Sequence, residues 1–291
     1  MSKKVLVTGG SGFIGSHVVD ALLAKKYNVT VLDITKPKRK KVKFIKGSIL
    51  NKNLLQSALK KKDFVFHLAA ISDVNKVKKI PITTISTNVL GTSYLLEACK
   101  KENIKRFIFA SSYYVYGKTK NLYTNSKIAA ELMIKNHNLL FGLNYTILRY
   151  PTTYGPRNRN VDAISIFFKR ALKNLDLFIH GDGKQIRNYV YVKDLAYGTV
   201  FALKKRAKNK IVTLKSTKNI KIFDLAKMII KITKSKSKIV IKKEKKRKND
   251  FNLKHSYNNK KNNDCIIWKP KYSFKKRLKQ YLKSENSYIN I

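Results

Sequence analysis

The chain has 291 residues, of which 43% are hydrophobic, and its 16 tyrosines and 14 phenylalanines exclude an intrinsically disordered protein. Its two cysteines exclude a disulfide-stabilised scaffold and favour a reducing compartment such as the cytoplasm. We expect no membrane span, because no window approaches 18 uninterrupted apolar residues, and no secretion signal, because three glycines interrupt the first apolar run.

The formal net charge of +48 comes almost entirely from lysine, since only 10 of the 64 basic residues are arginine. A strongly basic balance is typical of proteins that bind nucleic acid. Here, however, the lysines are scattered over nearly every segment and accompany abundant asparagine and isoleucine, which is the bias of an AT-rich coding sequence. We favour this second interpretation and keep a nucleic-acid-binding protein as the alternative. In either case the surface attracts anionic substrates.

Short apolar, β-branched runs alternate with helical patterns through the first 150 residues. Continuous apolar strands between amphipathic helices predict a parallel sheet covered on both faces, a doubly wound α/β fold. The predicted strands are 4–8, 28–33, 42–47, 63–70, 105–112 and 144–150. The predicted helices between them are 13–26, 51–61, 84–101 and 126–141.

After residue 154 the pattern loosens, with turns at "YGPRNRN" and "HGDGKQ". A helix over 192–205 and a strand over 210–214 are predicted to return to the first domain, and a last helix is predicted over 274–283. We therefore expect a Rossmann domain formed by 1–155 plus 189–215. A smaller α+β domain for the substrate is expected from 156–188 plus 216–291.

Three glycines with the spacing G-x-x-G-x-x-G separate the first predicted strand from the first predicted helix. In this context Gly9 allows a tight turn, Gly12 lets backbone N–H groups approach a pyrophosphate, and Gly15 lets the helix pack closely on the strand. Asp33 ends the second predicted strand, where a carboxylate binds ribose hydroxyls and repels a 2′-phosphate. The pattern therefore favours NAD over NADP, although the lysines of 36–41 weaken that repulsion.

Tyr123 and Lys127 are four residues apart, so in a helix they lie on one face. A free tyrosine has a pKa of about 10, and a neighbouring ammonium and a positively charged nicotinamide both favour the phenolate and move the pKa toward about 7. A surface tyrosine in a lysine-rich chain is the alternative. The serine pair just upstream favours a proton-transfer site. His67 is expected to pack or cap at a strand end without a chemical role.

Eight motifs in order resemble those of the extended short-chain dehydrogenase/reductases, in particular the NAD-dependent nucleotide-sugar epimerase/dehydratase family typified by UDP-glucose 4-epimerase. The resemblance covers essentially the whole chain. The motifs are "TGGSGFIG", "HLAA", "NVLGT", "FASSYYVYG", the Tyr123/Lys127 pair, "LRYPTTYGPR", "GDGKQIRNYVYVKDLA" and "RKND".

The resemblance implies a role for each matching residue. Tyr123 is the catalytic base or acid, Ser112 hydrogen-bonds the reacting sugar hydroxyl, and Lys127 binds the nicotinamide ribose and lowers the tyrosine pKa. The cofactor-binding set is Gly9, Gly12, Phe13, Ile14, Gly15, Asp33, Ser48, Ala69, Ala70, Asn88, Tyr123 and Lys127. The substrate-binding set is Ser112, Thr152, Arg187, Arg247 and Asp250.

Four departures from the family pattern bear on function. Only five residues separate Gly117 from Tyr123, where many members have about twenty, which shortens one wall of the sugar site. Tyr113 and Tyr114 stand where dehydratases and decarboxylases carry an acidic residue, which disfavours 4,6-dehydration. Ser48 replaces an aspartate at the adenine, and Thr152 replaces an asparagine at the diphosphate.

The expected function is therefore an NAD-dependent nucleotide-sugar 4-epimerase that acts through a transient 4-keto intermediate and needs no metal. The alternative within enzymes is an NAD(P)H-dependent reductase of a keto-sugar nucleotide. The helices near 81–101 and 124–141 resemble those that pair into a four-helix dimer interface in this family, so a homodimer is expected.

Overall fold

The computed structural model describes residues 2–38, 42–117, 121–158, 162–242 and 268–289. Within these residues, parallel strands form a seven-stranded sheet of order β10-β6-β5-β4-β1-β2-β3. Its strands are β1 (Lys4–Thr8), β2 (Asn28–Asp33), β3 (Lys43–Lys46), β4 (Phe64–His67), β5 (Arg106–Ser112), β6 (Tyr145–Tyr150) and β10 (Lys210–Thr213).

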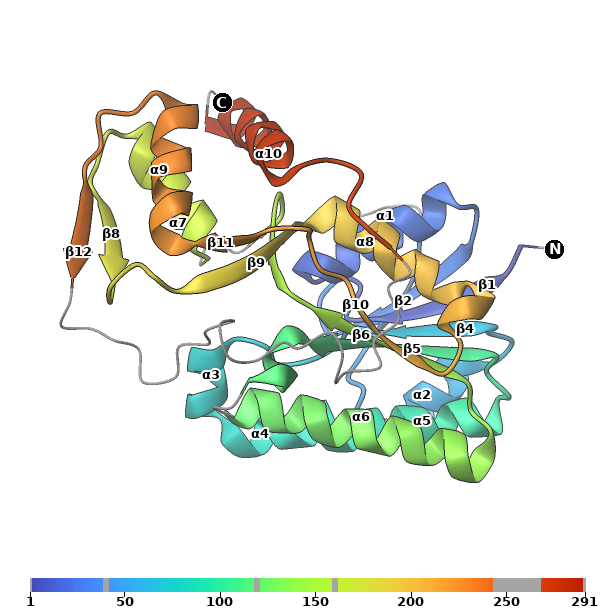
Figure 1. The fold of residues 1–291 in the computed structure, drawn as a ribbon. Helices are drawn as coiled ribbons and strands as arrows, with labels where there is room; N and C mark the ends of the chain where they lie inside the picture. The colour runs from blue at the N-terminus through green and yellow to red at the C-terminus, as the bar shows by residue number, and fades with distance from the viewer. Residues whose placement is uncertain (1, 39–41, 118–120, 159–161, 243–267, 290–291) are drawn as a thin grey trace.

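Helices cover both faces of this sheet, which confirms the predicted doubly wound fold (Figure 1). Successive strand residues point to opposite faces, so Val5 and Val7 pack in one core cluster and Leu6 in the other. One face is covered by α1 (Phe13–Ala24) and α8 (Val192–Val200), and the other by α2 (Lys52–Leu59), α5 (Gly91–Lys101) and α6 (Leu122–Phe141).

The predicted helix over 84–101 is a longer helical path with an irregular middle. It begins with α4 (Pro81–Ile85), because proline at the first helical position lacks only an N–H that would stay unpaired. It then runs through the π-helical turn η1 (Ser86–Leu90) into α5. A π turn displaces side chains from the regular helical positions and is frequent at functional sites. Asn88 lies in this turn.

The C-terminal half builds a second lobe around its own core, in the stretch where the sequence pattern loosened (Figure 1). Tyr154 and Tyr281 are fully buried there. Sheets of order β11-β9-β7 and β12-β8 pack with three helices. These elements are β7 (Thr152–Tyr154), β8 (Leu177–His180), β9 (Ile186–Tyr191), β11 (Asn219–Lys221), β12 (Ile239–Lys242), α7 (Ala163–Leu172), α9 (Ile222–Thr233) and α10 (Phe274–Ile289).

The chain crosses between the two parts more than once. It leaves the main sheet after β6, enters the second lobe through β7, α7, β8 and β9, and returns through α8 and β10 (Figure 1). It then enters the second lobe again at β11. The predicted domain limits at 155, 188 and 215 remain predictions about the folding units.

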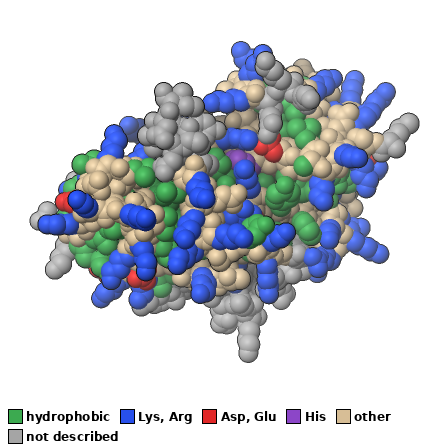
Figure 2. All heavy atoms as spheres, turned by 90° about the horizontal axis from the view of Figure 1, so that it is seen from above, with side chains coloured by type: hydrophobic (Ala, Val, Ile, Leu, Met, Phe, Trp, Pro, Cys, Tyr) green, Lys and Arg blue, Asp and Glu red, His purple; other side chains and the backbone are tan. Residues whose placement is uncertain are grey.

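Lysine and arginine side chains are distributed over the whole face seen in Figure 2, among apolar and neutral residues. The basic charge is therefore not confined to one groove on this face. No helix of the described residues is long and apolar enough to cross a membrane.

Candidate active site

The glycine loop follows β1 and is too closely packed to accept side chains at two positions. A Cβ atom on Gly9, whose φ is +71°, would lie 2.5 Å from the backbone nitrogen of Ala69. A Cβ atom on Gly15 would lie 2.0 Å from the carbonyl oxygen of Gly9. Helix α1 therefore begins directly against the end of β1. Gly12, at its N-cap, brings no side chain to cap it, and no acid lies in its first turn, so its N–H groups can bind a phosphate.

Asp33 lies at the end of the neighbouring strand β2, beside this loop. Its carboxylate accepts hydrogen bonds from the backbone N–H groups of Ser11 (2.9 Å) and Thr35 (3.0 Å). These two bonds orient the carboxylate and leave it lone pairs for ribose hydroxyls. Ser48 lies after β3, and its hydroxyl already accepts a hydrogen bond from the Leu50 N–H (3.2 Å).

Buried polar bonds hold the loop after β4, which contains Ala69 and Ala70. His67 ends β4, is fully buried, and hydrogen-bonds the hydroxyls of Thr8 (2.7 Å) and Thr92 (2.9 Å). As expected, this histidine packs at a strand end. Burial lowers its pKa to about 3, so it is neutral at physiological pH.

The Asn88 amide connects the same loop to helix α6. Its oxygen accepts from the Ile71 N–H (2.8 Å), and its nitrogen donates to the Ile71 carbonyl and the Ser126 hydroxyl, both at 3.0 Å. The side chain is thus used within the protein to position the loop. The predicted contact of Asn88 with the cofactor remains a prediction.

Ser112, Tyr123 and Lys127 come together where β5 ends and α6 begins. The Ser112 hydroxyl oxygen accepts a hydrogen bond from the Tyr114 N–H (3.2 Å), which leaves its proton for the hydrogen bond it makes with Tyr123. Helix α6 begins at Leu122, capped by Asn121, so Tyr123 and Lys127 do occupy one helix one turn apart. The Lys127 ammonium lies 5.9 Å from the centre of the Tyr123 ring and donates to the Ala110 carbonyl (2.8 Å).

The lowered pKa predicted for Tyr123 depends on a positively charged nicotinamide as well as on the Lys127 ammonium, and the protein's own groups shift this pKa in the opposite direction. Burial raises it to about 12, and the Ser112 hydrogen bond opposes this shift only in part. Burial also lowers the pKa of Lys127 to about 8, against the favourable charge of Glu131. The protein's own groups therefore hold Tyr123 as a neutral phenol at pH 7, the form that can donate a proton.

An ion pair behind this site was not anticipated from the sequence. Glu131 on α6 binds Arg149 on β6 through two hydrogen bonds of 2.7 and 3.1 Å, and it accepts a 2.5 Å hydrogen bond from the Ser111 hydroxyl. Two signals were present: Glu131 lies four residues after Lys127, and Arg149 is the one charged residue of an otherwise buried strand.

The predicted substrate residues are only partly covered by the described structure. Thr152 opens β7, and Arg187 lies on β9, which pairs with β7 in parallel. The Arg187 guanidinium donates to the carbonyl of Ile186 (3.0 Å). Arg247, Asp250 and part of the short segment between Gly117 and Tyr123 lie outside the described residues.

Comparison with known proteins identifies the family. Residues 5–214 match the model of the NAD dependent epimerase/dehydratase family. The chain belongs to this family. A protein of Methanocaldococcus jannaschii that carries the provisional name UDP-glucose 4-epimerase is 38% identical over 249 residues, 77% of this chain and 81% of that protein.

Other members of the family show how varied its activities are. A UDP-N-acetyl-alpha-D-glucosaminuronate decarboxylase of Bacillus cytotoxicus is 35% identical over 269 residues, 82% of this chain and 83% of that enzyme. The crystal structure of UDP-glucose 4-epimerase of Thermotoga maritima with UDP-glucose superposes with a TM-score of 0.87 at 29% identity and covers 98% of this chain and 99% of that one.

The cofactor of this family fits the residues present, so the expectation of NAD is confirmed. The absence of side chains at Gly9 and Gly15 allows the backbone of the phosphate loop to pack as closely as it does, since a Cβ atom at either position would collide with backbone atoms. The uncapped start of α1 suits the pyrophosphate, and the oriented carboxylate of Asp33 suits the adenine ribose.

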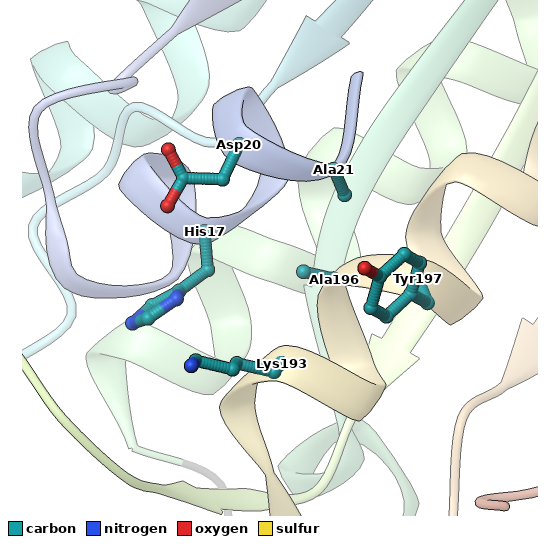
Figure 3. A pocket seen from close by; sticks show the side chains of 6 residues that line it. All are labelled: His17, Asp20, Ala21, Lys193, Ala196 and Tyr197. Carbon is teal, nitrogen blue, oxygen red and sulfur yellow. The ribbon is translucent and has the colours of Figure 1, made fainter. Parts of the chain in front are cut away.

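One prediction concerns His17 on α1, which lines a pocket with Lys193 and Tyr197 of α8 (Figure 3). Its Nε2 atom lies 2.9 Å from the Pro156 carbonyl oxygen, and burial lowers its pKa from 6.5 to about 4. Below its ordinary pKa, the unfolded chain binds a proton that the folded protein does not. Stability is therefore lost as the pH falls through 6.5 toward 4, by about 2 kcal/mol between about pH 7 and pH 5.

Urea unfolding at the two pH values measures this loss. The variant His17→Gln removes the titrating group but can still donate to the Pro156 carbonyl, so its stability should fall less over the same range. Equal losses in the two proteins would contradict the assignment to His17.

Proposed function

We propose that this enzyme is a nucleotide-sugar 4-epimerase that uses NAD. The observation that supports this most directly is the pair of tyrosines that follows Ser112. Elimination or decarboxylation needs an acid–base group beside the sugar in addition to Tyr123, and Tyr113 and Tyr114 are poor acid–base groups at pH 7. The carboxylate one turn beyond Lys127, that of Glu131, is already bound to Arg149.

Tyr123 removes the proton of the C4 hydroxyl as the C4–H bond breaks and a carbonyl forms. NAD, when bound, supplies the acceptor for this hydride, a positive charge that favours the phenolate, and the donor that returns the hydride. Ser112 donates a hydrogen bond to the new C4 carbonyl oxygen and holds the 4-keto sugar. After the sugar rotates, return of the hydride to the opposite face of C4 would invert this centre, and Tyr123 gives its proton back to the C4 oxygen.

Incubation with UDP-, dTDP- and GDP-sugars, with products resolved by anion-exchange chromatography and NMR, tests the proposal. We expect interconversion of C4 epimers without consumption of added NADH. Stoichiometric consumption of NADH would instead show a reductase of a keto-sugar nucleotide, and loss of water or carbon dioxide from the sugar would also contradict the proposal. Mass spectrometry of the nucleotide that co-purifies would identify the bound cofactor.

We also propose that the enzyme is a homodimer in the cytoplasm. Cys99 is a buried thiol that forms no disulfide among the described residues, in keeping with a reducing compartment. Large apolar side chains are exposed along one side of the molecule, on α4, η1 and α6, where a second copy would cover them. They are Ile82, Ile85, Leu90, Leu132, Leu139, Leu140 and Phe141.

Charge placed on this apolar surface should separate the subunits. Leu139 is 82% and Leu140 is 68% exposed, so the variant L139E/L140E should fold and elute as a monomer with about half the molar mass by light scattering. Leu175, which is exposed at 47% between α7 and β8, gives the control L175E, which should remain a dimer. A monomeric wild type would contradict the proposal.

A further inference from the structure

The cluster of Ser111, Glu131 and Arg149 connects strand β5 and helix α6, which carry Ser112, Tyr123 and Lys127, with the neighbouring strand β6. Ser111 precedes Ser112 on β5, and Glu131 lies one turn after Lys127 on α6. Arg149 on β6 is the register partner of Ser111. Ser111 and Glu131 therefore share a strand or a helix with a site residue, and Arg149 lies on the strand that pairs with β5.

The same cluster also anchors the turn that follows Ser112. The Arg149 guanidinium carbon lies 4.5 Å from the centre of the Tyr116 ring, and the Tyr116 hydroxyl lies 2.7 Å from the Thr213 hydroxyl. Tyr116 belongs to the 3₁₀ turn η2 (Tyr113–Tyr116), and Thr213 ends β10. The contacts thus reach from α6 across β5 and β6 to the edge of the main sheet.

The buried ion pair of Glu131 and Arg149 is not well explained by a contribution to the stability of the fold. The Glu131 and Arg149 side chains are 5% and 13% exposed, and burying two charges costs desolvation energy that their attraction often only balances. What the ion pair does supply is a fixed geometry. A carboxylate held at both oxygens by a guanidinium and at one by a hydroxyl has little freedom to rotate.

We propose that Glu131 is a positioning residue of the candidate active site, which fixes helix α6 against β5 and β6 so that Tyr123 meets Ser112 and Lys127 reaches the Ala110 carbonyl. The inference rests on the proposed function, because it assigns Glu131 to the same site. Glu131 itself acts through Ser111 and Arg149.

The carboxylate also acts on Lys127 through its charge. The Lys127 ammonium is faced by His67 on β4 and by Tyr123 and Glu131 on α6. The Glu131 carboxylate is faced by Tyr145 and Arg149 on β6, and the Tyr116 ring stacks on the Arg149 guanidinium. Of these groups, Glu131 raises the pKa of Lys127. Removing its charge should make Lys127 lose its proton at a lower pH, and with it the ammonium that supports Tyr123 and the nicotinamide ribose.

Two variants of Glu131 distinguish the effect of its side-chain length from the effect of its charge. Glu131→Gln keeps the length and removes the charge: we expect kcat to fall about tenfold and the alkaline limb of kcat/KM to move about one pH unit lower. Glu131→Asp keeps the charge and shortens the side chain: we expect a similar fall in kcat with the alkaline limb unchanged. Ser111→Ala leaves the ion pair and should lower kcat about threefold.

The variant Asp194→Asn is a matched control, because Asp194 (6% exposed) forms a comparable buried ion pair with Arg277 (12% exposed) between α8 and α10. It should lose stability without a shift of the alkaline limb. All variants are compared at a temperature below their melting midpoints. A Glu131→Gln protein with kcat within twofold of wild type and an unmoved limb would overturn the proposal. If that variant fails to fold, wild-type kcat in both Glu131→Asp and Ser111→Ala would do so.

The pH dependence of NAD affinity, measured by calorimetry, tests the same inference without any sugar. In Glu131→Gln the affinity should start to fall at about one pH unit lower than in wild type. An unshifted affinity profile in a folded variant would overturn the role of Glu131 and leave the 4-epimerase proposal standing. A wild type that converts no nucleotide sugar would overturn the 4-epimerase proposal and leave this measurement decisive for Glu131.

Discussion

Replacing Tyr123 with phenylalanine should lower kcat on the converted sugar about 10³-fold and leave the protein folded and able to bind NAD. The phenol is buried at the start of α6 and hydrogen-bonded to Ser112, so phenylalanine fills the same volume and loses only the hydroxyl that carries the proton. General acid–base groups contribute about 10²- to 10⁴-fold to rate, and the two residues that follow Ser112, Tyr113 and Tyr114, are poor acid–base groups at pH 7.

A matched control separates this effect from the loss of any buried hydroxyl. Tyr150 is also buried, and its hydroxyl lies 2.8 Å from the Thr199 hydroxyl on α8, which covers the face of the sheet opposite to α6. Tyr150→Phe should lower stability by about 1 kcal/mol and keep kcat within about twofold. Steady-state turnover and urea unfolding of both variants give the comparison. A Tyr123→Phe enzyme with wild-type turnover would show that another group transfers the proton.

Replacing Gly15 with alanine should lower NAD affinity at least about 100-fold. The added Cβ atom would lie 2.0 Å from the Gly9 carbonyl oxygen and 3.0 Å from the Gly10 Cα atom, so α1 or the loop must move. Both are backbone, and a displaced helix start no longer aims its N–H groups at the pyrophosphate. Calorimetric titration with NAD measures the loss.

Gly142, the left-handed C-cap of α6, provides the control for this substitution. Apart from atoms of the glycine and its two chain neighbours, no heavy atom lies within 4 Å of a Cβ atom there, so Gly142→Ala meets only the strain of its φ of +70°. That strain costs about 1 kcal/mol of stability, and NAD affinity should stay unchanged. Equal NAD affinity in Gly15→Ala and wild type would show that the cofactor does not lie against this loop.

Local sequence patterns were enough to predict the parallel sheet and its phosphate loop. Val5 and Val7 alternate with Leu6 within one short apolar run, and the glycines and Asp33 follow their strands at characteristic spacings. The second lobe was not resolved in this way. Helix α9 buries an apolar face that includes Leu225, Ala226 and Ile229. The sequence analysis did not predict this helix, because the many lysines around these residues obscure the apolar pattern.

The residues of the candidate site also differ in whether local sequence patterns could predict them. Tyr123 and Lys127 were predicted as a pair because one helical turn joins them, and Ser112 was predicted from the resemblance of its motif to the family. Glu131 and Arg149 were missed because their contact joins a helix to a strand 18 residues away, at a distance set by packing. The prediction of a lowered Tyr123 pKa counted the ammonium one turn away and a positively charged nicotinamide, and it had no measure of burial, which raises this pKa.

The sequence by itself determined the parallel sheet and the phosphate loop, because each depends on spacing along a few consecutive residues. It also indicated the family and the candidate catalytic residues, because short motifs that resemble those of the family follow one another in order along the chain. The tertiary structure alone decided how these catalytic residues are held and charged. Desolvation and the Ser111–Glu131–Arg149 contacts act between segments that are distant in the chain. The electrostatics of Tyr123 and Lys127 depend on those contacts, and no local pattern encodes them.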